Sequence, residues 1–318
     1  MNNSTYNDEE NKFPLYEDFF DELTSEHTRI SYRRDIKQFF DFMQDGFSNI
    51  NTLADIEKRH VVKFRNFLYE TGGRDGDPCS PKTICRKLAA ISSYFNYLSE
   101  RNIVKSNPTA SIKRPRSEVV TPTNALNGEQ VRALIDAIDQ NKKSGKMHKA
   151  LLLTFFTTGL RKQEILHLRR KDYTKLNGHH ILKYRGKGGK RGQKILHPIC
   201  VDALKEYLQW MKDQKREHIP EDWFFQPTKN PADPKNLNKP LNPKTINEIL
   251  NNYAKKINLT FNICPHSARA TFISELLEIG VDIYRVAQEV NHSSVKTTQE
   301  YDKRRRKLSD SPVYKLDY

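Results

Sequence analysis

A basic, proline-containing segment at residues 106–124 most constrains the fold, because it separates two stretches of apolar periodicity. It contains Lys113-Arg-Pro-Arg116 and Pro122, and no apolar repeat runs through it. Proline and charge without apolar periodicity are typical of a linker. The chain has 318 residues, which is more than one hydrophobic core usually organises. We therefore expect two domains, at residues 15–105 and 125–318, joined by this linker.

Hydrophobic spacing predicts that the first domain is entirely helical. Ile36, Phe39, Phe40 and Met43 fall on one face of a helix, and a longer apolar stripe indicates a helix at about residues 80–100. The polar residues 1–14 show no such spacing and are expected to be a disordered lead.

Cations near this helix and in the linker are candidate DNA contacts. Those of the helix lie off its apolar stripe and could face a groove of DNA, although a solvated helix face explains them equally well. Those of the linker could follow a phosphate backbone or could be ordinary solvated residues. The candidates are Lys82, Arg86, Lys87, Lys113, Arg114 and Arg116.

Helical periodicity resumes after the linker and is interrupted by a glycine-rich turn. Asn127 is a good helix N-cap, and Gly159 is expected to end a central apolar helix. Short apolar runs at residues 181–184 and 195–197 flank the basic turn at residues 185–192, which is typical of a β-hairpin. The expected fold class is therefore mainly α, with one small β-hairpin or sheet in the second domain.

The composition favours a nucleic-acid partner. The formal net charge is +15, and release of counterions from DNA or RNA would drive the binding of such a chain. No apolar run is long enough to span a membrane, and the polar N-terminus has no signal-peptide core. Four scattered cysteines form neither a zinc pattern nor a disulfide framework. We expect a cytoplasmic protein that uses no metal and no cofactor.

An arginine, a His-x-x-Arg motif, a histidine and a tyrosine follow one another in the second domain. They are Arg161, His266, Arg269, His292 and Tyr301. Two arginines can hold the non-bridging oxygens of one phosphodiester, most strongly when charge grows on a five-coordinate phosphorus. A tyrosine hydroxyl can attack that phosphorus and store the bond energy in a covalent intermediate. The set predicts that the protein breaks and rejoins DNA through a phosphotyrosine.

Neighbouring groups would assist this reaction. The arginines would ease deprotonation of the tyrosine hydroxyl, which ordinarily titrates near ~10. The departing 5′-oxygen needs a proton, and a lysine of the glycine-rich turn is a suitable donor. Glu164, one helical turn after Arg161, would orient that arginine rather than bind magnesium.

These residues resemble the sequence boxes of the tyrosine recombinases, also called the phage integrase family. The resemblance covers nearly the whole chain, because the residues before the linker are similar to the family's helical, SAM-like core-binding domain. As a combination, the boxes are highly specific. They are Thr158-Gly-Leu-Arg-Lys-Gln-Glu-Ile165, Gly186-Lys-Gly188, Pro265-His-Ser-Ala-Arg-Ala-Thr-Phe272 and Asn291-His-Ser-Ser-Val-Lys-Thr-Thr-Gln-Glu-Tyr301.

The resemblance implies a role for each residue of these boxes. Tyr301 would be the nucleophile. Arg161, Arg269 and His266 would hold the scissile phosphate, and His292 would donate a hydrogen bond to it.

The resemblance also implies that the hairpin turn carries the general acid. Lys187 matches the family's catalytic lysine, and Lys190 is the second choice because the register of the hairpin is open. Lys190 would otherwise contact DNA. One departure lies beside His292, where Asn291 stands at a position that is usually glycine. Asparagine also adopts the left-handed conformation, so we expect little damage.

A family member would act as an assembly on DNA. Its two domains would clamp double-stranded DNA at an inverted-repeat site, and a homotetramer would exchange strands through a Holliday junction. Off DNA the protein would be a monomer or dimer, with an oligomerisation tail at residues 309–318. It could act alone or with an accessory protein. In the cell it would associate with the nucleoid. Two alternatives remain: a type IB topoisomerase that relaxes supercoils as a monomer, and a catalytically idle DNA-binding accessory protein.

Overall fold

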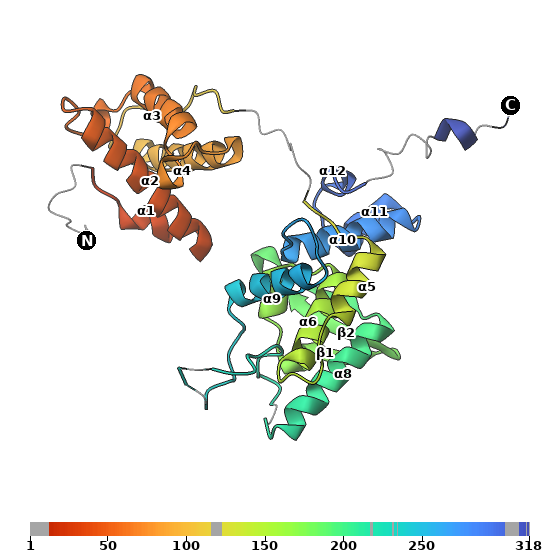
Figure 1. Ribbon diagram of the computed structural model, residues 1–318. Coiled ribbons are helices and arrows are strands. Elements are labelled where there is room, and N and C mark those ends of the chain that lie inside the picture. Colours follow the sequence, from red (N-terminus) through yellow and green to blue (C-terminus); the bar gives the residue numbers. More distant parts are fainter. Residues whose placement is uncertain are drawn as a thin grey trace. The chain divides into compact units, whose positions relative to one another are not determined.

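The chain divides into two compact units, Met1–Val120 and Thr121–Tyr318, each with its own hydrophobic core. The computed structural model in Figure 1 describes residues 13–115, 123–216, 219–230, 232–233, 235–302, 312–315 and 317. We call the units the helical unit and the catalytic unit. The fold class predicted from the sequence is confirmed: the described elements are mainly helical, and one small sheet lies in the second unit.

The helical unit is built from amphipathic helices around an aromatic core. Edge-to-face pairs such as Phe39 with Phe64, whose ring centroids lie 5.1 Å apart, join α2 to α3. Its described elements are α1 (Glu17–Asp21), α2 (Glu26–Gly46), η1 (Leu53–Asp55), α3 (Lys58–Glu70), η2 (Arg74–Gly76) and α4 (Pro81–Glu100).

Two segments that were expected to be irregular pack onto this unit. Phe13 is fully buried, and Pro14 accepts a hydrogen bond of 2.8 Å from the Tyr94 hydroxyl, so the expectation of a disordered lead is wrong at these residues. After α4, Ile112 packs against the core, and the backbone oxygen of Lys113 accepts a bond from Arg65. The first part of the predicted linker therefore lies along the helical unit.

The catalytic unit surrounds helix α6, which packs against α5, α8 and α10. Its described elements are α5 (Gly128–Asp136), α6 (Gly145–Thr158), α7 (Lys162–Leu166), η3 (Arg170–Asp172), β1 (Tyr173–Leu176), β2 (His179–Arg185), η4 (Lys187–Gly189), β3 (Arg191–Ile195), α8 (Pro198–Asp213), α9 (Pro243–Lys256), α10 (Pro265–Glu278), α11 (Ile283–Glu289), α12 (Val295–Gln299) and η7 (Pro312–Lys315).

Local sequence signals set the ends of these helices where expected. The Asn127 side chain accepts a bond from the backbone N–H of Gln130, and the Gln130 side-chain oxygen accepts one from the backbone N–H of Asn127, which completes a capping box at α5. Gly159 ends α6 in the left-handed conformation, with a φ of 60°. The chain then turns into α7 with Arg161 at its N-cap.

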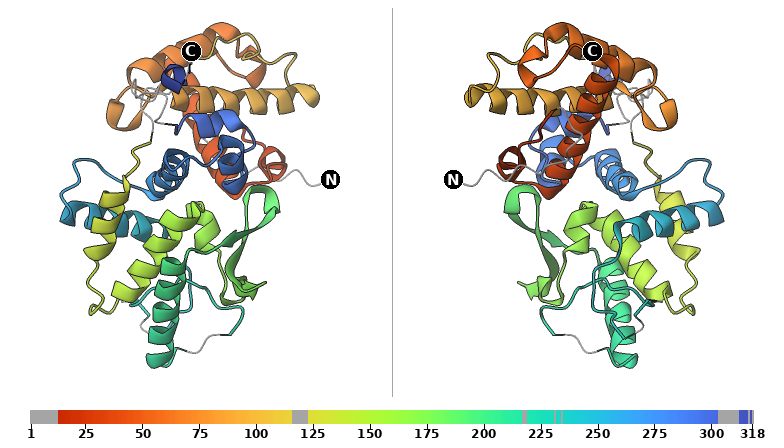
Figure 2. Two further views of the ribbon diagram at one scale, coloured as in Figure 1. Left: turned by 90° about the vertical axis from the view of Figure 1, so that its right-hand side faces the viewer. Right: turned by 90° about the vertical axis from the view of Figure 1, so that its left-hand side faces the viewer.

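The sheet has three antiparallel strands in the order β1-β2-β3, where the sequence had indicated two. The extra strand, β1, joins β2 through Asn177 and Gly178, whose φ angles are 47° and 82°. Such a pair is a strong hairpin signal. In both views of Figure 2 the sheet lies at one edge of the catalytic unit, beside α8.

The described residues contain neither a membrane-spanning helix nor a cluster of metal-ligating side chains. None of the helices there is both long and apolar enough to cross a bilayer. Nor do three or more His, Cys, Asp or Glu side chains in that part of the chain gather as a metal site would require.

Candidate active site

The Tyr301 side chain lies between two histidines. Its hydroxyl is 3.1 Å from Nε2 of His266, and its ring is nearly parallel to that of His292, with centroids 6.2 Å apart. The backbone is fixed as well, because the Tyr301 carbonyl accepts a bond of 3.1 Å from the Ser274 hydroxyl of α10. The tyrosine is therefore held by both its main chain and its ring.

Two arginines from distant segments, Arg161 and Arg269, both lie close enough to Tyr301 to lower the pKa of its hydroxyl. Arg161 bonds to Glu164 through its guanidinium, at 3.0 Å, and through its backbone N–H, at 2.7 Å. Glu164 therefore orients Arg161, as the sequence predicted. Arg269 lies one turn after His266 on α10 and is only 3% exposed. Its guanidinium donates to the carbonyls of Gly159 and Val290.

The pKa of Arg269 is lowered, because this cation is buried near a second one, Arg161. Burial, followed by repulsion from Arg161, lowers the pKa of Arg269 to about 10. It remains a cation at neutral pH, held by backbone carbonyls that carry no full negative charge. An anionic phosphate would relieve this repulsion.

The pKa of the Tyr301 hydroxyl does not follow the expectation from charge alone. Burial raises its pKa, and this effect outweighs the lowering by Arg269 and Arg161. The arginines do lower the pKa of the hydroxyl, as expected, but desolvation of a phenolate is the larger effect and the net pKa is raised. The hydroxyl stays protonated until a partner takes its proton.

His292 is held as a neutral imidazole. Burial, and then the nearby cations Arg269 and Arg161, lower its pKa to about 4. Its Nδ1 lies 2.8 Å from the hydroxyl of Thr298, which is fully buried on α12. Thr298 was not among the residues predicted from the sequence, although it lies six residues after His292 in the same box.

The hairpin turn contains the predicted general acids. The backbone of Lys187 lies in η4, but its side chain lies outside what the structure describes. Lys190 follows this turn with an exposed side chain. A further lysine, Lys194 on β3, was missed. It is buried, and its Nζ donates to the backbone oxygen of Glu289 and, at 2.7 Å, to its carboxylate.

The candidate DNA contacts of the helical unit differ in exposure. Lys82, Lys113 and Arg114 are exposed, and Arg116 lies outside the described residues. Arg86 forms an ion pair with the fully buried Asp35.

The prediction that Lys87 lies off the apolar face is wrong. Lys87 is only 8% exposed and donates to Gln38, with Asp35 at 3.9 Å. A buried carboxylate on α2 offsets the cost of burying this ammonium.

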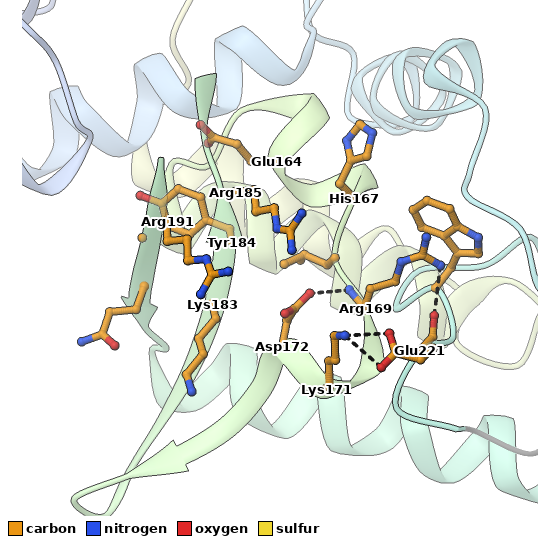
Figure 3. Close-up of a pocket in the computed structure, with 14 residues that line it drawn as sticks. Glu164, His167, Arg169, Lys171, Asp172, Lys183, Tyr184, Arg185, Arg191 and Glu221 are labelled. Atoms are coloured by element: carbon orange, nitrogen blue, oxygen red, sulfur yellow. Dashed lines mark hydrogen bonds and ion pairs between the residues drawn. The ribbon is translucent and has the colours of Figure 1, made fainter. Parts of the chain in front are cut away.

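A cavity of about 760 Å³ lies beside the site, between β2, β3 and the segments around residues 167–172 and 221–223. Figure 3 shows Glu164 and Tyr184 at its edge, with Arg169, Lys171 and Glu221 on the opposite side. Lys171 pairs with Glu221 at 2.6 Å, so charge in this cavity is partly neutralised within the protein.

Both units match known family models. The model described as "Phage integrase family" matches residues 124–307, and that described as "Phage integrase, N-terminal SAM-like domain" matches residues 16–102. Both matches agree with the resemblance drawn from the sequence boxes.

Curated relatives and solved structures agree with these models. The chain is 28% identical over 285 residues to tyrosine recombinase XerC of Thermodesulfovibrio yellowstonii, covering 87% of this chain and 85% of that one. It is 26% identical over 280 residues to tyrosine recombinase XerD of Staphylococcus aureus, covering 87% and 88%.

Two solved structures share the fold. One is the XerH site-specific recombinase bound to palindromic difH substrate in a post-cleavage complex, with a TM-score of 0.71, 22% identity, and coverage of 91% of this chain and 80% of that chain. The other is a lambda integrase dimer bound to a COC' core site, with a TM-score of 0.63, 18% identity, and coverage of 92% and 95%.

Proposed function

This chain belongs to the phage integrase family, and on that premise we propose how it cleaves and rejoins DNA. It is a site-specific tyrosine recombinase. The observation that carries the proposal is the position of the Tyr301 hydroxyl, 3.1 Å from His266 and in the field of Arg161 and Arg269. A nucleophile, a proton acceptor and a binding site for phosphate charge are thus in one place.

Cleavage begins with attack of the Tyr301 oxygen on phosphorus. The bond between that oxygen and phosphorus forms, and the bond from phosphorus to the 5′-oxygen breaks. The hydroxyl proton passes to Nε2 of His266, which their distance of 3.1 Å supports. The raised pKa of the hydroxyl is the reason that such an acceptor is needed. The products are a 3′-phosphotyrosine and a free 5′-hydroxyl.

The arginines stabilise the transition state in this proposal. Arg269 uses N–H groups on both terminal nitrogens to hold carbonyls, and a guanidinium has five such groups. The remaining donors are available to equatorial phosphate oxygens, where charge grows. Arg161, fixed by Glu164, donates from the other segment.

A neutral His292 adds a hydrogen bond to the phosphate. For Nε2 to donate, Nδ1 must accept, and the Thr298 hydroxyl at 2.8 Å can supply that hydrogen. The low pKa of His292 supports the neutral form.

A lysine of the hairpin turn protonates the leaving 5′-oxygen. We assign this role to Lys187, which matches the family box, with Lys190 as the second choice. Reversal of the same steps by a 5′-hydroxyl from a second DNA duplex rejoins the strands, and no nucleotide cofactor is needed, because the phosphotyrosine keeps the bond energy.

We propose that this recombination takes place at an inverted-repeat site. One of the similar structures holds a palindromic substrate, and the net charge of +15 suits a long DNA contact. Both units would clamp the duplex, with phosphate contacts from Lys82, Arg86, Lys113, Arg114, Arg116 and Lys190. Four protomers would pass through a Holliday junction, with the C-terminal tail docking on a neighbour. The compartment we propose is the cytoplasm, in association with the nucleoid.

Covalent capture on fragmented genomic DNA tests this function. The protein is denatured in detergent after incubation, linked fragments are recovered, and their ends are sequenced. We expect adducts clustered at one inverted-repeat site and none with Tyr301→Phe, whereas Tyr284→Phe, which removes an exposed hydroxyl, should behave as the unaltered protein. Scattered adducts would instead indicate a relaxing topoisomerase, and DNA binding without adducts would indicate an idle binding protein.

A further inference from the structure

The segment directly before His292 is held by side chains from elsewhere in the catalytic unit. Each of its three residues has a different partner. Glu289 accepts hydrogen bonds through its carbonyl and its carboxylate, and Val290 accepts one through its carbonyl. Asn291 donates one through its side-chain amide. The pairs are Glu289 with Lys194, Val290 with Arg269, and Asn291 with Tyr184.

Two of these three partners belong to the hairpin. Tyr184 lies on β2 and Lys194 on β3, and they are 7% and 3% exposed. The hairpin side chains are buried, whereas Glu289 and Asn291 are exposed, so leaving the buried partner of either bond unpaired would be costly. Lys194 also places a cation at the C-terminus of α11, where the helix dipole favours it.

The position of the Tyr184 ring is determined by the opposite strand. Tyr184 pairs directly with Gly192 of β3. A Cβ atom at residue 192 would lie 2.5 Å from Cζ of Tyr184 and 2.6 Å from its hydroxyl oxygen, so only glycine leaves room for the ring. Figure 3 shows Tyr184 at the edge of the cavity beside these strands. The orientation of the Tyr184 hydroxyl is therefore fixed, and it accepts a hydrogen bond from Nδ2 of Asn291.

Asn291 combines two properties that glycine could not. Its φ is 51°, so it occupies the left-handed conformation that the turn after α11 requires. Its backbone N–H still bonds to the carbonyl of Gln288 at 3.1 Å. The amide side chain is an addition to this turn, and its hydrogen bond reaches the hairpin.

We propose that the bond between Asn291 and Tyr184 is a positioning contact that aligns the general acid with the phosphate site. Tyr184 lies three residues before Lys187, and Asn291 is directly joined to His292. The bond thus connects the turn that donates the proton to the residue that holds the phosphate. This inference rests on the proposed recombinase function.

Two substitutions remove this bond with little other change. Tyr184→Phe keeps the ring over Gly192 and deletes the hydroxyl. Asn291→Gly keeps a residue that tolerates the positive φ and deletes the amide. The matched control is Tyr173→Phe on β1, because the Tyr173 hydroxyl is buried with no hydrogen-bond partner among the described residues.

The experiment measures single-turnover cleavage of two DNA substrates that carry the captured site. One has an ordinary phosphodiester, and the other has a 5′-bridging phosphorothiolate, whose thiolate leaving group needs no proton. With the ordinary substrate we expect each variant to cleave roughly tenfold more slowly, because the acid is misplaced. With the phosphorothiolate we expect rates within about twofold of the unaltered protein. The double variant should be no slower than either single one, since all remove the same bond.

Three results would overturn the proposal. Unchanged cleavage of the ordinary substrate by both variants would show that the bond positions nothing. An equal loss on both substrates would show a general structural defect instead of a misplaced acid. If the unaltered protein cleaved neither substrate, the recombinase function itself would fail, and the positioning contact would fall with it.

Discussion

At the residue scale, the site combines groups whose protonation depends on burial more than on charge. Tyr301 stays protonated despite two nearby arginines, and His292 stays neutral. A neutral imidazole can present its Nε2 hydrogen to phosphate only in one tautomer. The Thr298 hydroxyl, 2.8 Å from Nδ1, favours that tautomer when it donates its hydrogen to Nδ1.

Substitution of Thr298 by valine should therefore impair cleavage. Thr298→Val keeps the shape but removes the hydroxyl, so the imidazole is free to hold its hydrogen on Nδ1. We expect roughly tenfold slower formation of the covalent adduct, with DNA binding unchanged. Single-turnover cleavage and a gel-shift titration measure the two quantities. Thr297→Val, at an exposed position of the same helix, is the control. Equal cleavage by both variants would contradict the role of Thr298.

The sequence identified residues that the structure brings together around Tyr301, but not the residues that hold them. Arg161, His266 and Tyr301 belong to boxes with a recognisable order. Thr298 and Lys194 act through contacts made only by folding, and neither residue type signals such a role by itself. Burial could not be predicted from the sequence either. The raised pKa of Tyr301 depends on neighbouring side chains that no spacing rule identifies.

At the element scale, ion pairs and polar bridges between helices hold each unit together. In the helical unit, Asp35 on α2 is fully buried and faces Arg86 and Lys87 of α4. Loss of one partner of such a group leaves a buried charge uncompensated.

Asp35→Ala should strongly destabilise the helical unit. The buried Lys87 ammonium would lose its carboxylate, and we expect the free energy of unfolding to fall by about 3 kcal/mol. Urea denaturation followed by circular dichroism measures the change. Asp41→Ala, at an exposed position of the same helix, should cost far less. A similar small effect of both substitutions would show that the pairing contributes little.

A histidine bridge between α6 and α9 gives the catalytic unit a pH dependence. His148 bonds to the Tyr253 hydroxyl at 2.9 Å, and burial lowers its pKa from 6.5 to about 4. The unfolded chain therefore binds a proton that the folded unit resists, and stability is lost as pH falls from about 6.5 towards 4.

Removal of this histidine should flatten the pH profile. Its contribution corresponds to about 2 kcal/mol lost between pH 8 and pH 5. We expect the free energy of unfolding of His148→Asn to fall by about 2 kcal/mol less over the same interval. His292 titrates in both proteins, so its contribution does not affect the difference. Denaturant melts at several pH values measure this difference. Parallel profiles for the two proteins would contradict the assignment.

The sheet shows where element prediction from sequence failed. The apolar run at residues 181–184 identified β2. The run at residues 195–197 identified only the last residue of β3, because Arg191–Ile195 is otherwise polar or glycine. β1 was missed because Tyr173-Thr-Lys-Leu176 is short and half-exposed, so its alternation is weak. The turn at Asn177 and Gly178 was the available signal, since it predicts a hairpin regardless of the polarity of the strands.

At the scale of the whole molecule, two units with separate cores share one strongly basic chain. The division into two domains followed from chain length and the proline-containing segment. The sequence did not predict that Ile112, inside the proline-containing segment, packs against the core of the helical unit. The polar composition of that segment gave no sign of this contact.

The basic charge should make DNA binding strongly salt-dependent. Each phosphate contact releases counterions, and we expect affinity for duplex DNA to fall by at least about tenfold between about 50 and about 200 mM salt. Fluorescence anisotropy over a salt series measures the slope. Lys82→Ala should reduce the slope of log affinity against log salt concentration by about one, as expected for the loss of one phosphate contact. Lys87→Met should leave the slope unchanged, because Lys87 is buried. Equal slopes for Lys82→Ala and the unaltered protein would remove Lys82 from the interface.

The central claim is that Tyr301 becomes covalently joined to DNA. The most direct test digests the captured complex with nuclease and protease and locates the residual nucleotide by mass spectrometry. We predict a nucleotide 3′-phosphate on the peptide that contains Tyr301, linked to its hydroxyl. A nucleotide on any other residue, or its continued presence in Tyr301→Phe, would contradict the account.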